Sequence, residues 1–236
     1  MNQINYVQPS PYSCLAMVPW NVLGQLTPVQ LKSLYQTGVT RKLEKGDFVF
    51  HTGESAGGVH FLKSGKIKIT HAASSGKEII LWFCFGGDVF GLAEAMQNGD
   101  REVSAQACEV SEILSIPQVK FNAYLFEHPQ VMFMLLQVMA SRLRCLSDTL
   151  ANVAGEQVDT RFARLLFWLC TRYGRSDGES VIMNVHLTHQ EIADMIGATR
   201  QTVTSIMTSF KRQGILEIHD RFIHIIDKNQ LGTFMH

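Results

Sequence analysis

The sequence lacks an excess of charge of either sign, a long apolar run and a cluster of cysteines. Its 236 residues carry 21 Lys and Arg against 21 Asp and Glu, so bulk charge favours neither a nucleic acid nor a membrane surface. Apolar runs stay well short of the ~20 residues of a membrane span, so we expect no membrane partner. The N-terminus has no basic leader and is broken by prolines, which argues against a secretory signal and favours a cytoplasmic protein.

The sequence also lacks the short motifs of common enzymes. It contains no GxxxxGK[ST], GxGxxG, GxSxG or HExxH, and a single HxxH near the C-terminus is too weak a pattern for a metal site. We therefore expect neither an enzyme nor a metal centre. The five cysteines form no CxxC pair and suit a reducing compartment: Cys14, Cys84, Cys108, Cys145 and Cys170.

What the sequence does contain is a segment with the pattern of two short helices joined at a glycine, LTHQEIADMIGATRQTVTSIMTSFKRQGIL from Leu187 to Leu216. Thr188 and Glu191 have the spacing of a capping box, which predicts where the first helix begins. Gly197 supplies the turn, because a positive φ costs glycine little. Thr199 can cap the second helix, whose inward positions recur at spacings of three and four: Val203, Ile206 and Phe210. The pattern predicts a helix-turn-helix.

The other face of the second predicted helix is polar. Arginine matches the edge of guanine, glutamine matches adenine, and a threonine methyl can contact thymine, so this face fits double-stranded DNA. We predict that the DNA-binding residues are Thr188, Thr199, Arg200, Gln201, Thr202, Thr204, Ser205, Lys211, Arg212 and Arg221. A helical hairpin whose polar face is only solvated is the alternative, but it does not explain why caps and turn occur in register.

Two short alternating runs after Gly214, at 216–218 and 222–226, predict a two-stranded wing around Asp220 and Arg221. Residues 156–236 hold nine basic and nine acidic residues, so support for DNA binding comes only from the local cluster of cations. A dimer would present that cluster twice to phosphates.

Between Val39 and Leu114 the sequence changes to short β-prone runs separated by glycine turns. The predicted strands lie at 48–50, 59–62, 66–70, 79–83 and 111–116, and their spacing indicates an antiparallel barrel or sandwich. The interior of such a barrel can hold a small ligand.

A third element begins at Pro129 and shows an unbroken heptad pattern. Its apolar positions step by four and three: Met132, Leu136, Met139, Leu143, Leu146, Leu150 and Val153. This pattern predicts a long helix that pairs with a second copy along a coiled-coil seam. A helix that packs on its own barrel is the alternative, and Gly155 ends or bends the helix in either case.

The order of glycine-rich barrel, heptad helix and winged helix-turn-helix resembles the Crp/Fnr family of bacterial transcription regulators. The resemblance covers nearly the whole chain and is carried by EKGDFVFHTGE (44–54), FLKSGKIKI (61–69), GGDVFG (86–91) and LTHQEIADMIGATRQTV (187–203). It implies an α+β homodimer with an antiparallel jelly-roll sensor, under allosteric control, and RNA polymerase as a further partner. The expected domains are an N-terminal extension (1–24), a sensor (25–128), a dimerisation helix (129–155) and a DNA-binding domain (156–236).

The cyclic AMP site of the family falls on residues that depart from its pattern. Gly91 is followed by Leu92 instead of the glutamate that holds the ribose, and Arg101 by Glu102 instead of serine. The resemblance places a small effector, still unknown but not cyclic AMP, at Gly91, Leu92, Ala93, Arg101, Glu102, Leu143, Leu146 and Ser147. Glu94 is expected to point away from the ribose position, and Arg101 has a surface ion pair as its alternative role.

The residues that bind an iron-sulfur cluster or haem in other branches of the family have few counterparts in this sequence. An iron-sulfur cluster typically needs four thiolates, and only Cys14 lies in the N-terminal region, which argues against a cluster. Ala93 stands where the carbon-monoxide-sensing branch has its histidine. Haem of the nitric-oxide-responsive kind stays open because candidate ligands lie in or beside the sensor: His51, His60, His71, His128, Met132, Met134 and Met139. Their alternative roles are surface or turn positions for the histidines and core filling for the methionines.

Two classes of function therefore remain, a DNA-binding regulator and a ligand-binding scaffold that does not bind DNA. In the reading helix, Gln201 and Ser205 replace a glutamate and an arginine that are usual in the family. If the chain is a regulator, we expect its half-site to differ from the usual family palindrome.

Overall fold

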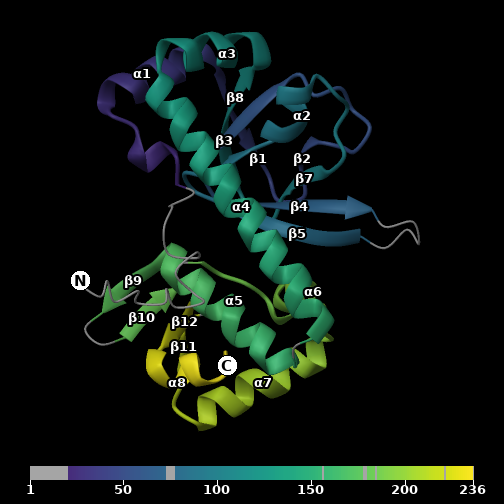
Figure 1. Cartoon of the computed structure of the whole chain (residues 1–236), viewed down its shortest axis with the longest axis vertical. Helices are drawn as coiled ribbons and strands as arrows, with labels where there is room; N and C mark the ends of the chain where they lie inside the picture. The colour runs from purple at the N-terminus through teal and green to yellow at the C-terminus, as the bar shows by residue number, and fades with distance from the viewer. Residues whose placement is uncertain are drawn as a thin grey trace, which may run out of the picture. The chain divides into compact units, whose positions relative to one another are not determined.

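The computed structural model describes residues 21–72, 78–155, 157–177, 180–183, 185–220 and 222–235 (Figure 1). The chain divides into two compact units. Among the described residues, the sensor unit consists of 21–136 together with 187–204, and the wing unit consists of 137–186 and 205–235.

The sensor unit contains two four-stranded sheets in which every pairing is antiparallel. The first sheet has the order β1 (Val39–Leu43), β8 (Ser111–Pro117), β3 (Gly58–Ser64), β6 (Val89–Phe90). The second has the order β2 (Phe48–Phe50), β7 (Ser104–Ala107), β4 (Lys66–Ala72), β5 (Glu78–Phe85). Apart from the hairpin of β4 and β5, paired strands in both sheets are not consecutive in sequence, as expected of a jelly roll rather than a simple meander.

One apolar cluster contains buried residues of both sheets. Its fully buried members include Leu62 and Ile113 of the first sheet and Ile67 and Cys84 of the second. Because strand side chains alternate between faces, β4 contributes Ile67 and Ile69 and β7 contributes Ala105 and Ala107 to this cluster. Side chains of the two sheets thus share one apolar core.

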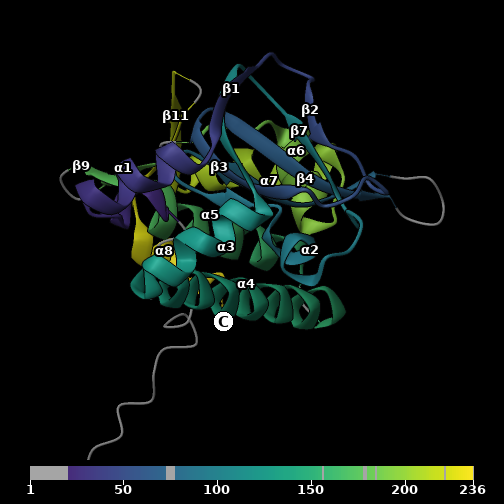
Figure 2. The same cartoon turned by 90° about the horizontal axis from the view of Figure 1, so that it is seen from above.

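Helices cover one side of the first sheet. Helix α1 (Pro28–Thr37) begins at a capping box formed by Thr27 and Gln30, with proline at its first position. Helix α3 (Gln118–Glu127) contacts α1, β3 and β8, and both views of the molecule show α1 and α3 side by side (Figures 1 and 2). The sensor unit also contains two shorter helical segments, η1 (Leu23–Gln25) and α2 (Leu92–Gln97).

Helix α4 (Pro129–Gly155) is the longest in the chain, and its limits match the predicted third element. The wing unit contains helix α5 (Val158–Tyr173), which packs against β9 (Gly174–Asp177), β10 (Ser180–Met183) and α8 (Lys228–Thr233). Its antiparallel sheet has the order β11 (Leu216–His219), β12 (Phe222–Ile225), β10, β9. The ring of Phe210 packs against α5 and the end of α8: its centroid lies 5.4 Å from that of Phe162 in α5 and 4.7 Å from that of Phe234, which directly follows α8.

The strands predicted from glycine spacing and alternation are confirmed, and the wing is confirmed as β11 and β12. Strands β1, β6, β7, β9 and β10 and helix α2 were not predicted, because each is short and has no strong periodicity of its own. No helix within the described ranges is long and apolar enough to span a membrane.

Candidate nucleic-acid interface and barrel interior

Helix α6 (His189–Ile196) begins at the predicted capping box. The Glu191 amide donates to Thr188 Oγ1 (3.2 Å), and the Thr188 amide donates to Glu191 Oε2 (2.7 Å). Ile192, Ala193 and Ile196 form its buried face. The local sequence therefore fixes both the start and the orientation of this helix.

Gly197 ends α6 in the left-handed region at φ 64°, as predicted, and the Ala198 amide closes the turn on Ala193 O at 2.9 Å. Helix α7 (Arg200–Arg212) then begins with Thr199 as its cap, because the Thr202 amide donates to Thr199 Oγ1 (3.1 Å). Together α6, the turn and α7 form the expected helix-turn-helix.

Helix α7 has a buried side and an exposed side. Val203 and Phe210 are buried as predicted, Ile206 is only half-buried, and Met207 is a buried position that was not predicted. The predicted DNA-binding residues Thr188, Thr199, Arg200, Gln201, Thr204, Ser205, Lys211 and Arg212 are exposed, and Thr202 is half-buried. Arg221 lies outside the described residues. The exposed side thus keeps arginine and glutamine at the start of the helix, where base contacts are usually made.

The hydroxyl of Thr204 is already engaged within the helix-turn-helix. It donates to Arg200 O (2.9 Å) and lies 2.8 Å from His189 Nδ1. Its methyl group remains as the part that could contact a thymine. His189 therefore links the start of α6 to α7, a role that periodicity could not reveal because it depends on how the two helices cross.

In the wing, β11 and β12 pair in register, with Ile218 opposite Ile223 and Asp220 at the turn with φ 50°. A positive φ is uncommon outside glycine, and aspartate is among the residues that tolerate it. His219 Nε2 lies 2.6 Å from Glu217 Oε2 on the exposed surface of the same hairpin. The wing is thus a tight hairpin with one apolar, buried side and a polar pair on its exposed side.

Arg101 is buried inside the barrel, with only 3% of the residue exposed. Its guanidinium donates to Gly91 O (2.7 Å) and Gly58 O (2.6 Å), lies 3.4 Å from Glu94 Oε2, and stacks 4.1 Å from the centroid of the Phe50 ring. Burial lowers the pKa of Arg101, while the charge of Glu94 and its hydrogen bond act in the opposite direction. The surface ion pair considered for Arg101 is therefore wrong.

The residues around Arg101 also differ from expectation. Glu94 is buried and turns toward the guanidinium, so its distance along the sequence does not keep it out of this site. Leu92 is buried, whereas Ala93 and Glu102 are exposed, and among the expected effector residues of the barrel Arg101 contacts Gly91 directly. Sequence reasoning missed Glu94 because the short helix α2, which carries it inward, was not predicted.

His60 lies beside Arg101 in the same interior. Its ring centroid is 5.6 Å from Phe50 and 5.3 Å from Phe90, and its Nδ1 lies 3.0 Å from Ser115 Oγ. Burial, followed by the charges of Arg101 and Arg41, lowers the pKa of His60 to about 3. The expectation of a surface or turn position is thus wrong for His60.

The other histidines considered as haem ligands occupy separate places. His51 is exposed and stacks on Phe48, His71 Nδ1 lies 3.1 Å from Glu102 O, and His128 Nε2 lies 3.4 Å from Ser33 Oγ. His60 is buried in one cluster with the rings of Phe50 and Phe90, whose own centroids lie 6.3 Å apart, so a haem bound to His60 would require this cluster to rearrange. Within the part of the chain that the structure describes, no three His, Cys, Asp or Glu gather as metal ligands.

The cysteines that the structure describes are buried or half-buried thiols. Cys84 lies in the barrel core, and burial raises the pKa of Cys108 and that of Cys170, the latter to about 12. A thiol with a raised pKa is a poor nucleophile. Cys14 and the side chain of Cys145 lie outside the described residues.

Helix α4 has a buried stripe and an exposed apolar stripe. Val131, Leu135 and Val138 are buried against the chain itself. The predicted seam lies elsewhere on the helix: Leu136, Leu143 and Leu146 are 62%, 66% and 43% exposed, and Met132 and Met139 are half-buried. The side chains of Leu150 and Val153 lie outside the described residues. Ser147, expected at the effector site, is exposed and donates to Leu143 O (3.0 Å).

Comparison with known proteins supports both parts of this arrangement. Residues 40–128 match the cyclic nucleotide-binding domain, and residues 160–234 match the Crp-like helix-turn-helix domain. The CRP-like cAMP-activated global transcriptional regulator of Mycobacterium tuberculosis is 29% identical over 199 residues, covering 82% of this chain and 89% of the relative. The global nitrogen regulator of Synechococcus elongatus is 27% identical over 188 residues, covering 79% and 85%.

Among solved structures, FixK2 from Bradyrhizobium japonicum has the same fold. The two structures have a TM-score of 0.73 at 21% sequence identity, over 84% of this chain and 98% of FixK2. The matched domains cover the barrel and the winged helix-turn-helix in the order expected from the sequence. The chain therefore belongs to the Crp/Fnr family of transcription regulators.

Proposed function

We propose that the chain is a homodimer that reads a roughly palindromic DNA site under the control of a small effector other than cyclic AMP. The observation that carries this proposal is the two-sided helix α7, with an apolar side that packs inward and an exposed side that begins with Arg200 and Gln201. Arginine at this position is suited to guanine O6 and N7, and glutamine to adenine N6 and N7.

The exposed apolar stripe of α4 supports the homodimer. Leu136, Leu143 and Leu146 follow the heptad spacing that favours pairing with a second helix. Burying each such side chain contributes about 1.5–3 kcal/mol, so a second copy of α4 is the partner that this stripe fits best. A dimer would also present two reading helices to two half-sites.

The barrel interior argues against cyclic AMP as the effector. The guanidinium expected to hold a phosphate already donates to two backbone carbonyls and faces the carboxylate of Glu94. Binding a phosphate there would break these contacts, and the adjacent carboxylate would repel the anion. The carboxylate that would hold the ribose is replaced by Leu92, which is buried.

DNA binding can be tested by selecting sites from random double-stranded DNA with the purified chain. We expect enrichment of a palindrome with guanine in each half-site, and DNA affinity that falls as salt rises. A ligand-binding scaffold without DNA binding would enrich no sequence. Cyclic AMP should leave the affinity for the selected site unchanged in the same assay.

The haem alternative has its own readout, the absorption spectrum of the purified chain. The residues around His60 do not fit an axial ligand as they are packed, so we expect no Soret band after expression with a haem supply. A strong Soret band would establish haem and would place its ligands at other residues or in a rearranged barrel.

A further inference from the structure

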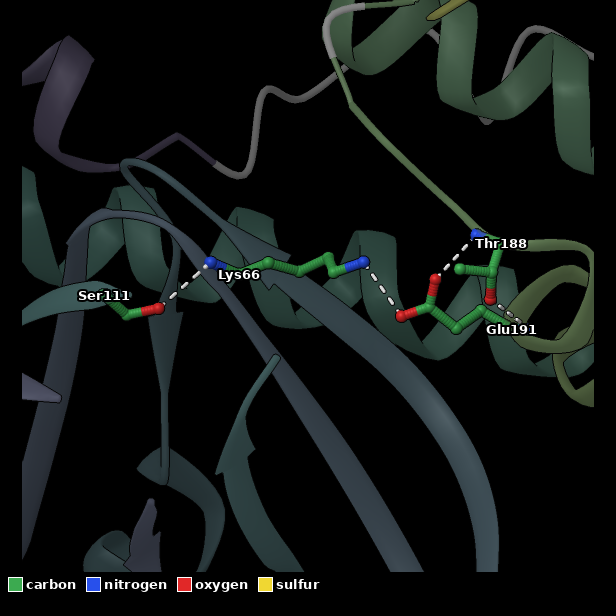
Figure 3. Close-up of polar contacts among 4 residues, drawn as sticks. All are labelled: Lys66, Ser111, Thr188 and Glu191. Carbon is green, nitrogen blue, oxygen red and sulfur yellow. Dashed lines mark hydrogen bonds and ion pairs between the residues drawn. The ribbon is translucent and has the colours of Figure 1, made fainter. Parts of the chain in front are cut away.

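A buried ion pair joins the barrel to the first helix of the helix-turn-helix. Lys66 Nζ of β4 lies 2.8 Å from Glu191 Oε1 of α6 (Figure 3). The two side chains are 7% and 17% exposed. Both residues belong to the sensor unit, which includes the barrel, all of α6 and α7 as far as Thr204.

The barrel end of this pair is held in place by backbone contacts. The Lys66 amide donates to Ser111 Oγ (3.2 Å; Figure 3). Lys66 O accepts from the Cys108 amide (2.8 Å). Its ammonium group also lies 5.2 Å from the centroid of the Phe83 ring, within the range of a cation–π contact. A change in the path of β4 would therefore move the ammonium group with it.

The helix end of the pair is the carboxylate that caps α6. Glu191 Oε2 accepts from the Thr188 amide while Oε1 accepts from Lys66, so one carboxylate serves the cap and the barrel together (Figure 3). Burial alone would raise the pKa of Glu191, but the hydrogen bonds from Lys66 and Thr188 lower it below its usual value. The carboxylate is thus held in its charged form at the start of the helix.

Contacts between α6 and the start of α7 fix these two segments relative to each other. The turn at Gly197 closes through the Ala198 amide, and His189 Nδ1 of α6 lies 2.8 Å from Thr204 Oγ1 of α7. Helix α6 also contacts β5, the strand that pairs with β4. The path from Lys66 to the exposed base-reading residues thus runs through short, specific contacts.

We propose that Lys66 is a positioning residue that holds α6, and with it the base-reading start of α7, in a fixed place against the barrel. This inference rests on the proposed function, because its consequence is a fixed spacing between the two reading helices of a dimer. A binding element that is already held in place loses less conformational entropy when it binds DNA. The Lys66–Glu191 ion pair therefore favours DNA sites with one particular spacing between the half-sites. It also provides a route by which a change in the barrel reaches the reading helix.

The test uses two substitutions that spare the cap. Glu191→Gln keeps an oxygen for the Thr188 amide, as glutamine serves in a capping box, and removes the charge. Lys66→Met keeps most of the apolar stem and removes the ammonium group. Lys68→Met is the matched control, because Lys68 lies on the same strand and pairs at 2.8 Å with Glu78, which belongs to the barrel.

The measured quantity is the affinity of each full-length chain for its selected palindrome and for versions with one base pair added or removed between the half-sites. We expect the unaltered chain and Lys68→Met to prefer the selected spacing. Lys66→Met and Glu191→Gln should each reduce that preference by roughly three- to tenfold, and the double variant should show no further loss. Preference for bases within a half-site should stay the same, because Arg200 and Gln201 are unchanged.

Three results would overturn the inference: an unchanged spacing preference in both variants, additive losses in the double variant, or tighter binding at the selected spacing. Amide exchange across residues 189–196 gives an independent arm that needs no DNA. It should become faster in Glu191→Gln and Lys66→Met than in Lys68→Met, and equal exchange in all three would contradict the positioning role. If the unaltered chain binds no DNA, the proposed function fails by itself, and the exchange result still decides whether Lys66 holds α6.

Discussion

Two arginines, Arg101 in the barrel and Arg200 at the start of α7, occupy opposite environments. Arg101 is buried, and its two terminal guanidinium nitrogens contact Gly58 O, Gly91 O and Glu94 while the group stacks on the ring of Phe50, whereas Arg200 is exposed at a helix start. An arginine whose hydrogen bonds lie mainly inside the fold acts chiefly on stability, and one whose donors are exposed can bind a partner. The barrel arginine is therefore engaged mainly by the chain itself, while the helix-turn-helix has an exposed reading face.

The largest expected effect comes from Arg101. Arg101→Met should destabilise the chain by about 3–5 kcal/mol, because it leaves Glu94 and two backbone carbonyls buried without their donor. Urea unfolding followed by circular dichroism would measure the loss. Glu102→Ala, which removes an exposed neighbouring charge, should change stability by less than ~0.5 kcal/mol. A small effect at Arg101 would mean that the guanidinium is available to a ligand after all.

His60 predicts a pH dependence of stability. Its pKa is lowered from 6.5 to about 3 in the folded chain, so the unfolded chain binds the extra proton first. Stability contributed by the neutral imidazole is complete above pH 6.5 and declines as the pH falls from 6.5 toward 3, by at most ~1.4 kcal/mol per pH unit. Unfolding curves across this range should be flatter for His60→Gln. Identical curves for both proteins would show that His60 is not the group responsible.

Arg200 predicts an effect on DNA binding without an effect on stability. Arg200→Ala should lose roughly 1–3 kcal/mol of specific binding per half-site and relax the preference for guanine at one position. Fluorescence anisotropy with the selected palindrome would measure it. Lys211→Ala serves as the comparison, since loss of a phosphate contact should weaken all sequences alike and reduce the salt slope by about one. An unchanged base preference in Arg200→Ala would contradict the proposed placement of this residue.

The smallest expected effect concerns the turn between α6 and α7. Gly197 has φ 64°, so Gly197→Ala should cost about 1–2 kcal/mol of stability, and Gly197→Asn should cost less because asparagine tolerates this region. Thermal unfolding would rank the two variants. Equal losses for alanine and asparagine would indicate that contacts, rather than backbone conformation, determine the residue at this position.

The difference between these regions also explains what could be predicted from the sequence. The helix-turn-helix was predictable because its signals are local: a cap three residues from its partner, a glycine at positive φ, and a spacing of three and four. The roles of Arg101 and Glu94 could not be predicted, because Gly58 and Phe50 reach Arg101 only through the crossing of distant strands. His60 was misplaced for the same reason, since Phe50 and Phe90 come from separate strands.

The most direct test of the account is selection of double-stranded DNA by the full-length chain, followed by affinity measurements on the enriched sequence and its separate halves. The account predicts a palindrome whose two half-sites lie about one helical turn apart, with far weaker binding to a single half-site. Enrichment of an asymmetric site bound equally well by one half, or of no sequence at all, would contradict it.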